Sequence, residues 1–254
     1  MTQDVTLVVE DRILILTLNR PHVRNAVNRA LAEAVAAALD DLDADDGLSA
    51  CVITGAGAAF CAGRDLKAAR DGDDPYVERR GFGGITRYGS VKPLLAAVEG
   101  YALGGGFEIT LACDLIVAGA SAKFGLPEVR RGRIAGAGGL FRLPERLPYH
   151  VAMELALTGG SIPAQRAEGF GLVNRVVPDG TALPAAVELA KLIAGNGPLA
   201  VAASKRVVLE SGDWPTAEAF ERQEPISEAV RASEDAKEGA RAFAEKRPPV
   251  WRNR

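Results

Sequence analysis

The hydrophobic pattern changes along the chain, from short apolar runs to helical spacing alone beyond residue 195. Short runs bounded by glycine, proline or charge are typical of strands. They predict strands at residues 5–9, 13–18, 50–54, 95–98, 115–118 and 172–177. Apolar residues that recur every three to four positions predict helices. These helices are expected at about residues 28–42, 106–113, 137–143, 149–157, 182–194, 199–211, 215–231 and 233–246.

Two less regular stretches are each expected to contain a short helix. Residues 70–92 are charged, glycine-containing and weakly periodic, which predicts a mobile segment at an entrance, with a helix at about 75–86. The second helix is expected to start at Ser161-Ile162-Pro163 and to end at Gly169.

A strand, a glycine turn and a helix follow one another near Val52, Val98 and Val117. This alternation predicts an α/β fold with parallel strands. The carboxyl ends of such strands lie on one side of the sheet, so a binding crevice is expected there. Because no strand is predicted after residue 195, we expect a core at residues 1–195 and an appended helical unit at 196–254.

The last predicted helix is well specified at both ends. Ser233 is a suitable N-cap, acidic residues follow it, and Lys246 and Arg247 stand in the last turn. Its apolar stripe, Ala236, Ala240 and Phe243, is narrow and small, which favours packing against another chain.

Composition narrows the possible functions. The chain has 254 residues, of which 48% are hydrophobic, so it can bury a sizeable core. A net charge of −3 with scattered Lys and Arg argues against nucleic acid as a partner. The start, residues 1–5, lacks a basic n-region, and the apolar stretches are too short to span a membrane, so a soluble cytoplasmic protein is expected. Cys51, Cys61 and Cys113 are expected to be reduced packing residues.

The candidate chemistry lies between residues 98 and 128. Three glycines, Gly104-Gly105-Gly106, follow a predicted strand and can present bare N–H groups at a helix start. Glu108 stands in the first turn of that apolar helix with no cation at helical spacing, and Glu128 is a second unpartnered carboxylate. A glutamate in a first turn is also favoured by the helix dipole alone, so this segment by itself leaves a purely structural role open.

A second glycine-rich segment, residues 55–66, also follows a predicted strand and could act together with the glycine turn at residues 104–106. The two turns could aim the backbone N–H groups of Arg64 and Gly105 at one point and so form an oxyanion hole, for which a thioester carbonyl is a natural guest. Two carboxylates in apolar settings can share a water, one removing its proton while the other delivers a proton to carbon. These parts describe the addition of water across an activated double bond.

Three rival interpretations are weaker. A NAD-dependent oxidoreductase is disfavoured because Phe60 stands where the third glycine of the dinucleotide fingerprint belongs. A catalytically silent CoA-thioester binder would be favoured if Glu108 or Glu128 were salt-bridged. Cys61 as a nucleophile, paired with His22 or His150, lacks a supporting motif.

Nearly the whole chain resembles the crotonase superfamily, whose best-defined members are the enoyl-CoA hydratases. The resemblance rests on Asn19-Arg20-Pro21 with Asn25-Ala26, Ala59 to Leu66, Gly100 to Glu108, Phe124 to Glu128, Gly136 to Gly139, Gly171-Leu172-Val173 with Val176-Val177, and Ala242 to Arg247. It implies an α/β spiral of βαβ units with a C-terminal helical trimerisation region. A homotrimer, or a hexamer of two trimers, is therefore expected.

Residue roles follow from the resemblance by position. It implies that the Arg64 and Gly105 amides hold the thioester oxygen and that Glu108 and Glu128 are the two catalytic acids of a hydratase. It implies a CoA site at His22, Val23, Arg24, Ala62, Arg64, Asp65, Leu66, Lys67, Gly104 and Gly136, with Phe243 and Lys246 contributed by a neighbouring subunit. The resemblance implies no metal and no separate cofactor, because CoA is part of the substrate.

Three features leave the reaction open within the superfamily. Isomerases and hydrolases commonly lack one of the two glutamates, so the presence of both favours hydration over isomerisation. Ala135 stands where many hydratases have proline. Phe107 and the tail through Trp251 are more similar to carnitinyl-CoA dehydratases.

Overall fold

The computed structural model describes residues 4–254 and has a six-stranded sheet at its centre. Residues 1–3, which belong to the stretch assessed for an n-region, lie outside the described residues. The strands are β1 (Val5–Glu10), β2 (Ile13–Leu18), β3 (Ala50–Gly55), β6 (Leu94–Val98), β8 (Leu115–Gly119) and β11 (Arg175–Val177). They lie in the order β1-β2-β3-β6-β8-β11, and only the β1–β2 hairpin is antiparallel. The structure thus confirms the predicted α/β fold with parallel strands.

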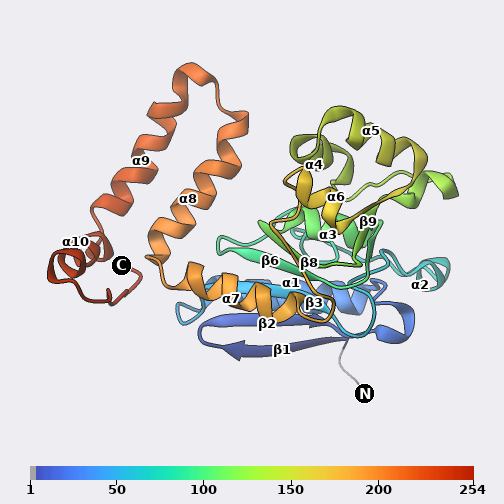
Figure 1. Cartoon of the computed structure of the whole chain (residues 1–254), viewed down its shortest axis with the longest axis horizontal. Helices are drawn as coiled ribbons and strands as arrows, with labels where there is room; N and C mark the ends of the chain where they lie inside the picture. Colours follow the sequence, from blue (N-terminus) through green and yellow to red (C-terminus); the bar gives the residue numbers. More distant parts are fainter. Residues whose placement is uncertain (1–3) are drawn as a thin grey trace.

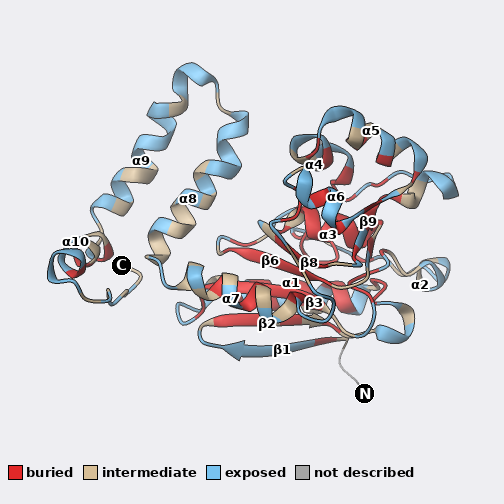
Figure 2. Ribbon diagram, in the orientation of Figure 1, coloured by how far each residue is buried: buried red, intermediate tan, exposed pale blue. Residues whose placement is uncertain are grey.

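Both faces of this sheet are covered by helices. Alternate residues such as Leu16, Ile53 and Val98 pack toward α1 (Arg29–Ala44) and α3 (Gly105–Ala112). The intervening residues, among them Val52 and Leu95, pack against α7 (Ala182–Ala194). Because side chains alternate across a strand, this arrangement buries the parallel strands on both faces. β3, β6 and α3 are almost wholly buried, whereas the edge strand β1 is mostly exposed (Figure 2).

Very short strands complete the core. β7 (Tyr101–Leu103), β9 (Lys123–Gly125) and β10 (Ser161–Pro163) form a second sheet in the order β10-β9-β7. The prediction of a helix start at residues 161–163 is therefore wrong, since α6 (Ala164–Gly169) begins only after this strand. The last strand is also shorter than predicted, because Leu172 and Val173 are buried in a turn ahead of β11.

The segment at residues 70–92 contains no helix at the predicted position. β4 (Tyr76–Val77) and β5 (Gly81–Phe82) form a small antiparallel hairpin there, preceded by α2 (Leu66–Arg70). Gly81, Gly83 and Gly84 all have positive φ, which a helix does not allow. The buried guanidinium of Arg80 fixes the hairpin to α1, with Nη2 at 2.5 Å from Asp40 and 3.3 Å from Asp43.

The remaining helices form two groups. α4 (Gly139–Arg146) and α5 (Tyr149–Thr158) lie with α6 beside α3, on the side of the sheet opposite α7 (Figure 1). α8 (Pro198–Glu210) and α9 (Ala219–Arg231) form an exposed hairpin that stands away from the core, and α10 (Glu234–Glu245) follows. A groove of about 1000 Å³ separates this hairpin from the core, with Tyr88, Arg146, Leu209 and Ile226 among the residues along it.

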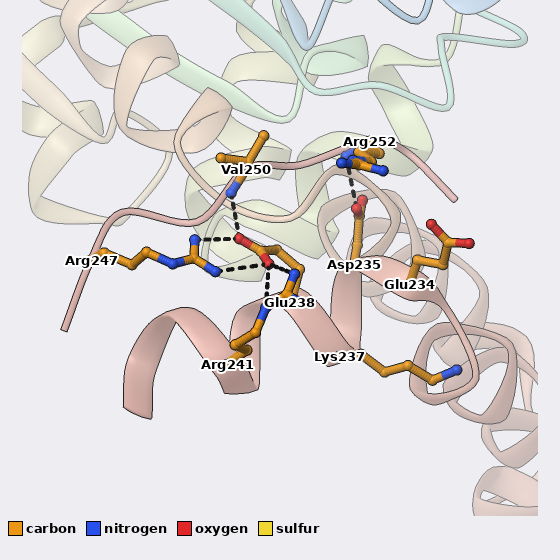
Figure 3. A pocket seen from close by; sticks show the side chains of 8 residues that line it. All are labelled: Glu234, Asp235, Lys237, Glu238, Arg241, Arg247, Val250 and Arg252. Atoms are coloured by element: carbon orange, nitrogen blue, oxygen red, sulfur yellow. Dashed lines mark hydrogen bonds and ion pairs between the residues drawn. The ribbon is translucent and has the colours of Figure 1, made fainter. Parts of the chain in front are cut away.

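The C-terminal tail is fastened to α10 (Figure 3). Ser233 caps the helix as predicted, accepting from Ala236 N at 3.0 Å. The buried Asp235 carboxylate accepts from the backbone amides of Arg252 and Asn253 at 2.8 and 2.9 Å. Glu238 accepts from the Val250 amide at 3.0 Å and from Arg247 Nη1 at 2.6 Å. We call these contacts of Asp235 and Glu238 the tail latch.

No single helix within residues 4–254 is long and apolar enough to cross a membrane. α7 and the segment Pro198–Asp213 meet the length and hydropathy criteria only when they are taken together, and they are bent by 108°.

Candidate active site

The start of α3 is formed by a glycine turn after β7. Gly104 is the N-cap with φ +57°, and its amide donates to Gly125 O at 2.8 Å. Gly105 is the first helical residue, so its N–H has no partner within the helix. A Cβ on Gly105 would collide with the Phe82 ring, which packs directly over this turn. A glycine at position 105 is therefore what lets Phe82 pack against the start of the helix.

The Arg64 amide lies on a neighbouring segment. Leu103 N donates to Cys61 O and Cys61 N donates to Tyr101 O, both at 3.0 Å, so the chain at residue 61 runs beside β7. Two residues later, a Cβ on Gly63 would lie 3.0 Å from Gly105 N. In the described part of the chain, the Arg64 amide donates to no backbone carbonyl. The structure thus brings the two predicted segments together and leaves their amides available to a ligand.

Asn25 holds the loop that leads to Arg64. This fully buried side chain donates through Nδ2 to the carbonyls of Ala56, Ala59 and Phe60 at 2.9, 2.8 and 3.1 Å. Its Oδ1 accepts from Arg20 N at 2.9 Å. Asn25 was not predicted to have this role from the sequence; its positive φ of 55° agrees with the preference of asparagine for left-handed turns.

Glu108 is buried in α3 and is held by two backbone amides. Its Oε1 accepts from Ala137 N at 2.7 Å and from Gly139 N at 2.9 Å. Burial raises the pKa of this carboxyl, and the two amide donors and the Arg142 guanidinium partly oppose the rise. Oε1 is thus occupied by protein donors, and Oε2 receives no hydrogen bond from residues 4–254.

Glu128 lies in the 3-10 turn Pro127–Arg131, against the start of α3. Its Oε1 would be 2.7 Å from a Cβ on Gly104, and its Oε2 is buried without a hydrogen-bond partner. Burial raises the pKa of this carboxyl, and the negative charge of Glu108 raises it further. Within residues 4–254, neither Glu108 nor Glu128 forms an ion pair. The absence of an ion pair at both carboxylates in this part of the chain argues against a catalytically silent CoA-thioester binder.

The hairpin at residues 76–82 forms a wall beside the two carboxylates. Tyr76 and Phe82 pack edge to face with ring centroids 5.6 Å apart. The Tyr76 hydroxyl would lie 3.8 Å from a Cβ on Gly136. Burial raises the pKa of this phenol, and the charge of Glu108 adds to the rise. Ala135 is buried in the facing loop.

The other residues expected to bind CoA lie mainly on one exposed surface. Ala62 N donates to Arg24 O at 3.0 Å, which joins the turn Pro21–Val23 to the segment that precedes α2. Exposed members of this surface are His22, Arg24, Ala62, Leu66 and Lys67, and Val23 is half-buried. Asp65 differs, because Oδ1 caps α2 through the amides of Lys67 and Ala68 while Oδ2 is 3.0 Å from Arg20 Nη1. Asp65 therefore fixes this surface instead of presenting a free carboxylate.

Phe243 and Lys246 are not near these residues within one chain. Both are exposed in or next to α10, which lies at the opposite end of the molecule from α2 (Figure 1). Their expected contact with CoA requires another subunit and stays a prediction.

The three cysteines are free and buried. Burial raises the pKa of the Cys61 thiol to about 12, so the thiolate that a nucleophile requires is not formed near neutral pH. No group of three or more His, Cys, Asp or Glu in residues 4–254 is arranged to hold a metal ion. The cavity of about 680 Å³ lined by Lys237, Arg241 and Arg252 lies on α10, away from both glutamates.

The amides that hold Glu108 were not among the predicted site residues. The Ala137 and Gly139 donors come from 29 and 31 residues further along the chain, so spacing around Glu108 could not reveal them. The glycines of residues 136–139 were the available signal, because φ is +104° at Gly138 and a side chain there would meet Arg142.

Comparisons with known proteins agree with this geometry. The chain matches the model of the enoyl-CoA hydratase/isomerase family over residues 9–254. It is 45% identical over 248 residues to enoyl-CoA hydratase EchA19 of Mycobacterium tuberculosis, covering 95% of this chain and 93% of that protein. It is 40% identical over 262 residues to carnitinyl-CoA dehydratase of Salmonella enteritidis, with 100% of both chains covered. The crystal structure of enoyl-CoA hydratase EchA1 from Mycobacterium marinum superposes with a TM-score of 0.97 at 55% identity, over 99% of this chain and 100% of that one.

Proposed function

Because the chain belongs to the enoyl-CoA hydratase/isomerase family, we propose that it is an enoyl-CoA hydratase. The reaction is the reversible addition of water to a trans-2-enoyl-CoA thioester to give 3-hydroxyacyl-CoA. The observation that supports it most is the pair of carboxylates without an ion pair, Glu108 fixed through one oxygen and Glu128 with a buried, unpartnered oxygen. Hydration removes one proton from the water that bonds to the β-carbon and delivers one proton to the α-carbon, so it uses two such groups.

The thioester carbonyl is polarised by the Arg64 and Gly105 amides. The carbonyl oxygen gains negative charge when water adds to the β-carbon, and the N-terminal end of α3 adds a favourable dipole. A single lost donor of this kind costs about 2.7–4 kcal/mol of transition-state stabilisation.

The two glutamates divide the proton transfers according to their surroundings. Two amide donors on Glu108 favour its charged form, so Glu108 takes the proton of the water whose oxygen bonds to the β-carbon. Burial and the charge of Glu108 raise the pKa of Glu128, and in this scheme Glu128 is the proton donor that delivers a proton to the α-carbon. Glu108 gains one proton and Glu128 loses one, so a single proton passed between them restores the pair.

CoA lies across the exposed surface of His22, Val23, Arg24, Ala62, Arg64, Leu66 and Lys67, with Gly104 and Gly136 beside the acyl group. Asp65 supports this surface through Arg20 and α2. Phe243 and Lys246 meet the adenine and phosphates from a neighbouring subunit of a trimer or of a hexamer of two trimers.

A second candidate is carnitinyl-CoA dehydration, which the identity to the Salmonella dehydratase over both full lengths favours. The same two carboxylates perform it in the direction of water loss. Isomerisation of the double bond is a third candidate, and it requires only one of them.

The test is turnover of enoyl-CoA esters of several chain lengths, with crotonobetainyl-CoA included, by wild type, Glu108→Gln and Glu128→Gln. Each substitution should lower hydration at least about a hundredfold. The double variant should be little worse than the poorer single one, because both groups grip one water. The red-shifted absorption of a bound aromatic enoyl-CoA should persist, since both amides remain. Near-normal hydration by Glu128→Gln with loss of isomerisation would identify an isomerase instead.

A further inference from the structure

Arg142 connects the loop that holds Glu108 to the segment that follows the hairpin of residues 76–82. This partly buried side chain on α4 donates through Nη2 to Thr86 O at 2.7 Å and through Nη1 to Ala137 O at 3.4 Å. Thr86 follows the hairpin whose Phe82 covers Gly105, and Ala137 belongs to the loop that binds the Glu108 carboxylate. The planar fork of a guanidinium can hold two carbonyls in a fixed geometry, which a single ammonium cannot.

We propose that Arg142 is a positioning residue for Glu108, which bridges the Thr86 and Ala137 carbonyls and so keeps the Ala137 and Gly139 amides directed at Glu108 Oε1. The inference deepens the proposed hydratase function and rests on Glu108 as the base that activates water. Arg142 is not placed in contact with the substrate. Its role is to fix the orientation of the Glu108 carboxylate, which does contact the substrate in the proposed reaction.

The charge of Arg142 acts on the same carboxylate. The charged or titratable groups that face Glu108 are Arg142 from α4, Tyr76 from β4 and Glu128 from the Pro127–Arg131 turn. Of these, only the Arg142 guanidinium favours the ionised form of Glu108. Its removal should raise the pKa of Glu108, so the base becomes available only at higher pH.

Arg146 provides a matched control. It stands one turn further along α4, is also partly buried, and donates to Leu111 O near the end of α3. It therefore joins α4 to α3, and it donates to neither Thr86 nor Ala137. Arg146→Met removes a comparable guanidinium and its packing while leaving the amides at Ala137 and Gly139 in place.

The first experiment measures kcat and KM against pH for wild type, Arg142→Met, Arg142→Lys and Arg146→Met. Arg142→Met should lower kcat about 10- to 100-fold, as expected when a reacting group is mispositioned, with KM nearly unchanged. The acid limb of its kcat/KM profile should move to higher pH. Arg142→Lys should keep the acid limb of the wild type but lose part of kcat, because the charge remains and the bridge does not. If Arg142→Met and Arg146→Met gave equal losses with unmoved acid limbs, the inference would be overturned.

A second measurement separates this inference from the proposed function. The carboxyl 13C resonance of Glu108, assigned with Glu108→Gln, can be titrated whether or not any enoyl-CoA is turned over. Its pKa should rise in Arg142→Met and stay at the wild-type value in Arg146→Met. An unchanged titration in Arg142→Met refutes the positioning role, whereas inactive wild type toward every ester refutes the hydratase alone.

Discussion

Gly63 precedes Arg64 and lies against the turn that carries the Gly105 amide. Its φ is +91°, and a Cβ there would lie 2.9 Å from Leu103 O and 3.0 Å from Gly105 N, so one segment would have to move. Gly63→Ala should therefore lower kcat at least about tenfold and weaken the red shift of a bound aromatic enoyl-CoA, because the two donors no longer converge. Gly72→Ala is the control, since Gly72 has a similar φ of +89° and nothing within 4 Å of the added Cβ. Similar kinetic losses in the two variants would show that backbone strain, not the spacing of the amides, is responsible.

Glu128 should be a residue that lowers stability. Burial raises the pKa of Glu128 in the folded state, so ionisation of this carboxyl destabilises the fold. The penalty is absent at acid pH, where Glu128 is protonated in the folded and the unfolded protein. It is complete above the pKa of the folded state. Glu128→Gln should accordingly have a higher Tm than wild type at neutral pH, by about 2–4 °C for each kcal/mol relieved. The difference should shrink as the pH falls toward the unfolded pKa of about 4.3.

Differential scanning calorimetry at several pH values measures this difference. Glu33→Gln is a suitable control, because Glu33 is exposed and pairs with Arg29 on the surface of α1. A Glu128→Gln protein less stable than wild type at neutral pH would contradict the prediction.

Sequence periodicity was sufficient to predict the longer strands and helices. The expected strands at residues 13–18, 50–54 and 95–98 and the helix at 182–194 are present, because their burial patterns extend over several residues. β7, β9 and β10 have three residues each, which is too short for an alternating pattern to be recognised. The hairpin of residues 76–82 was mistaken for a helix because its turns depend on glycines with positive φ.

The candidate site was predictable to a similar extent. Arg64, Gly105, Glu108 and Glu128 stand in recognisable local patterns, and the structure brings them together. Arg142 and the two amide donors of Glu108 could not be predicted, since their roles arise from contacts between loops that are distant in sequence.

The tail latch makes the end of the chain depend on α10. Asp235→Ala removes an acceptor shared by the amides of Arg252 and Asn253, and these amides then lose their partner. We expect the tail to be cleaved by trypsin at least about tenfold faster than in wild type, because local opening becomes easier by roughly 1–3 kcal/mol. Glu234→Ala is the control, because Glu234 forms only an exposed ion pair with Arg254. Equal cleavage rates in the two variants would show that Asp235 does not hold the tail.

For the whole molecule, the expected association predicts a specific charge effect. Lys246 ends α10, which lies at the opposite end of the molecule from α2 (Figure 1), so it could reach the proposed CoA site only across a subunit interface. Lys246→Ala should weaken binding of CoA thioesters several-fold at low salt and less at high salt, because an ammonium and a phosphate form a screened contact. Lys237→Ala, which changes an exposed lysine of the same helix, is the control.

Two results would contradict this prediction. One is an unchanged affinity of Lys246→Ala at low salt, measured by isothermal titration calorimetry. The other is a monomer at micromolar concentration in sedimentation, because no neighbouring subunit would then be available to supply Lys246.

The six strands of the main sheet lie side by side in the order in which the ribosome makes them. Each new strand can therefore join the growing edge as the nascent chain emerges, without waiting for a later strand to be inserted. The face that includes Val52, Leu95 and Val117 nevertheless has no cover until α7 is complete at Ala194. Synthesis thus passes through a long stage in which a paired sheet is bare on one side, and an exposed apolar sheet of this kind is what chaperones bind. α7, which takes no part in the proposed chemistry, is the helix that ends this stage.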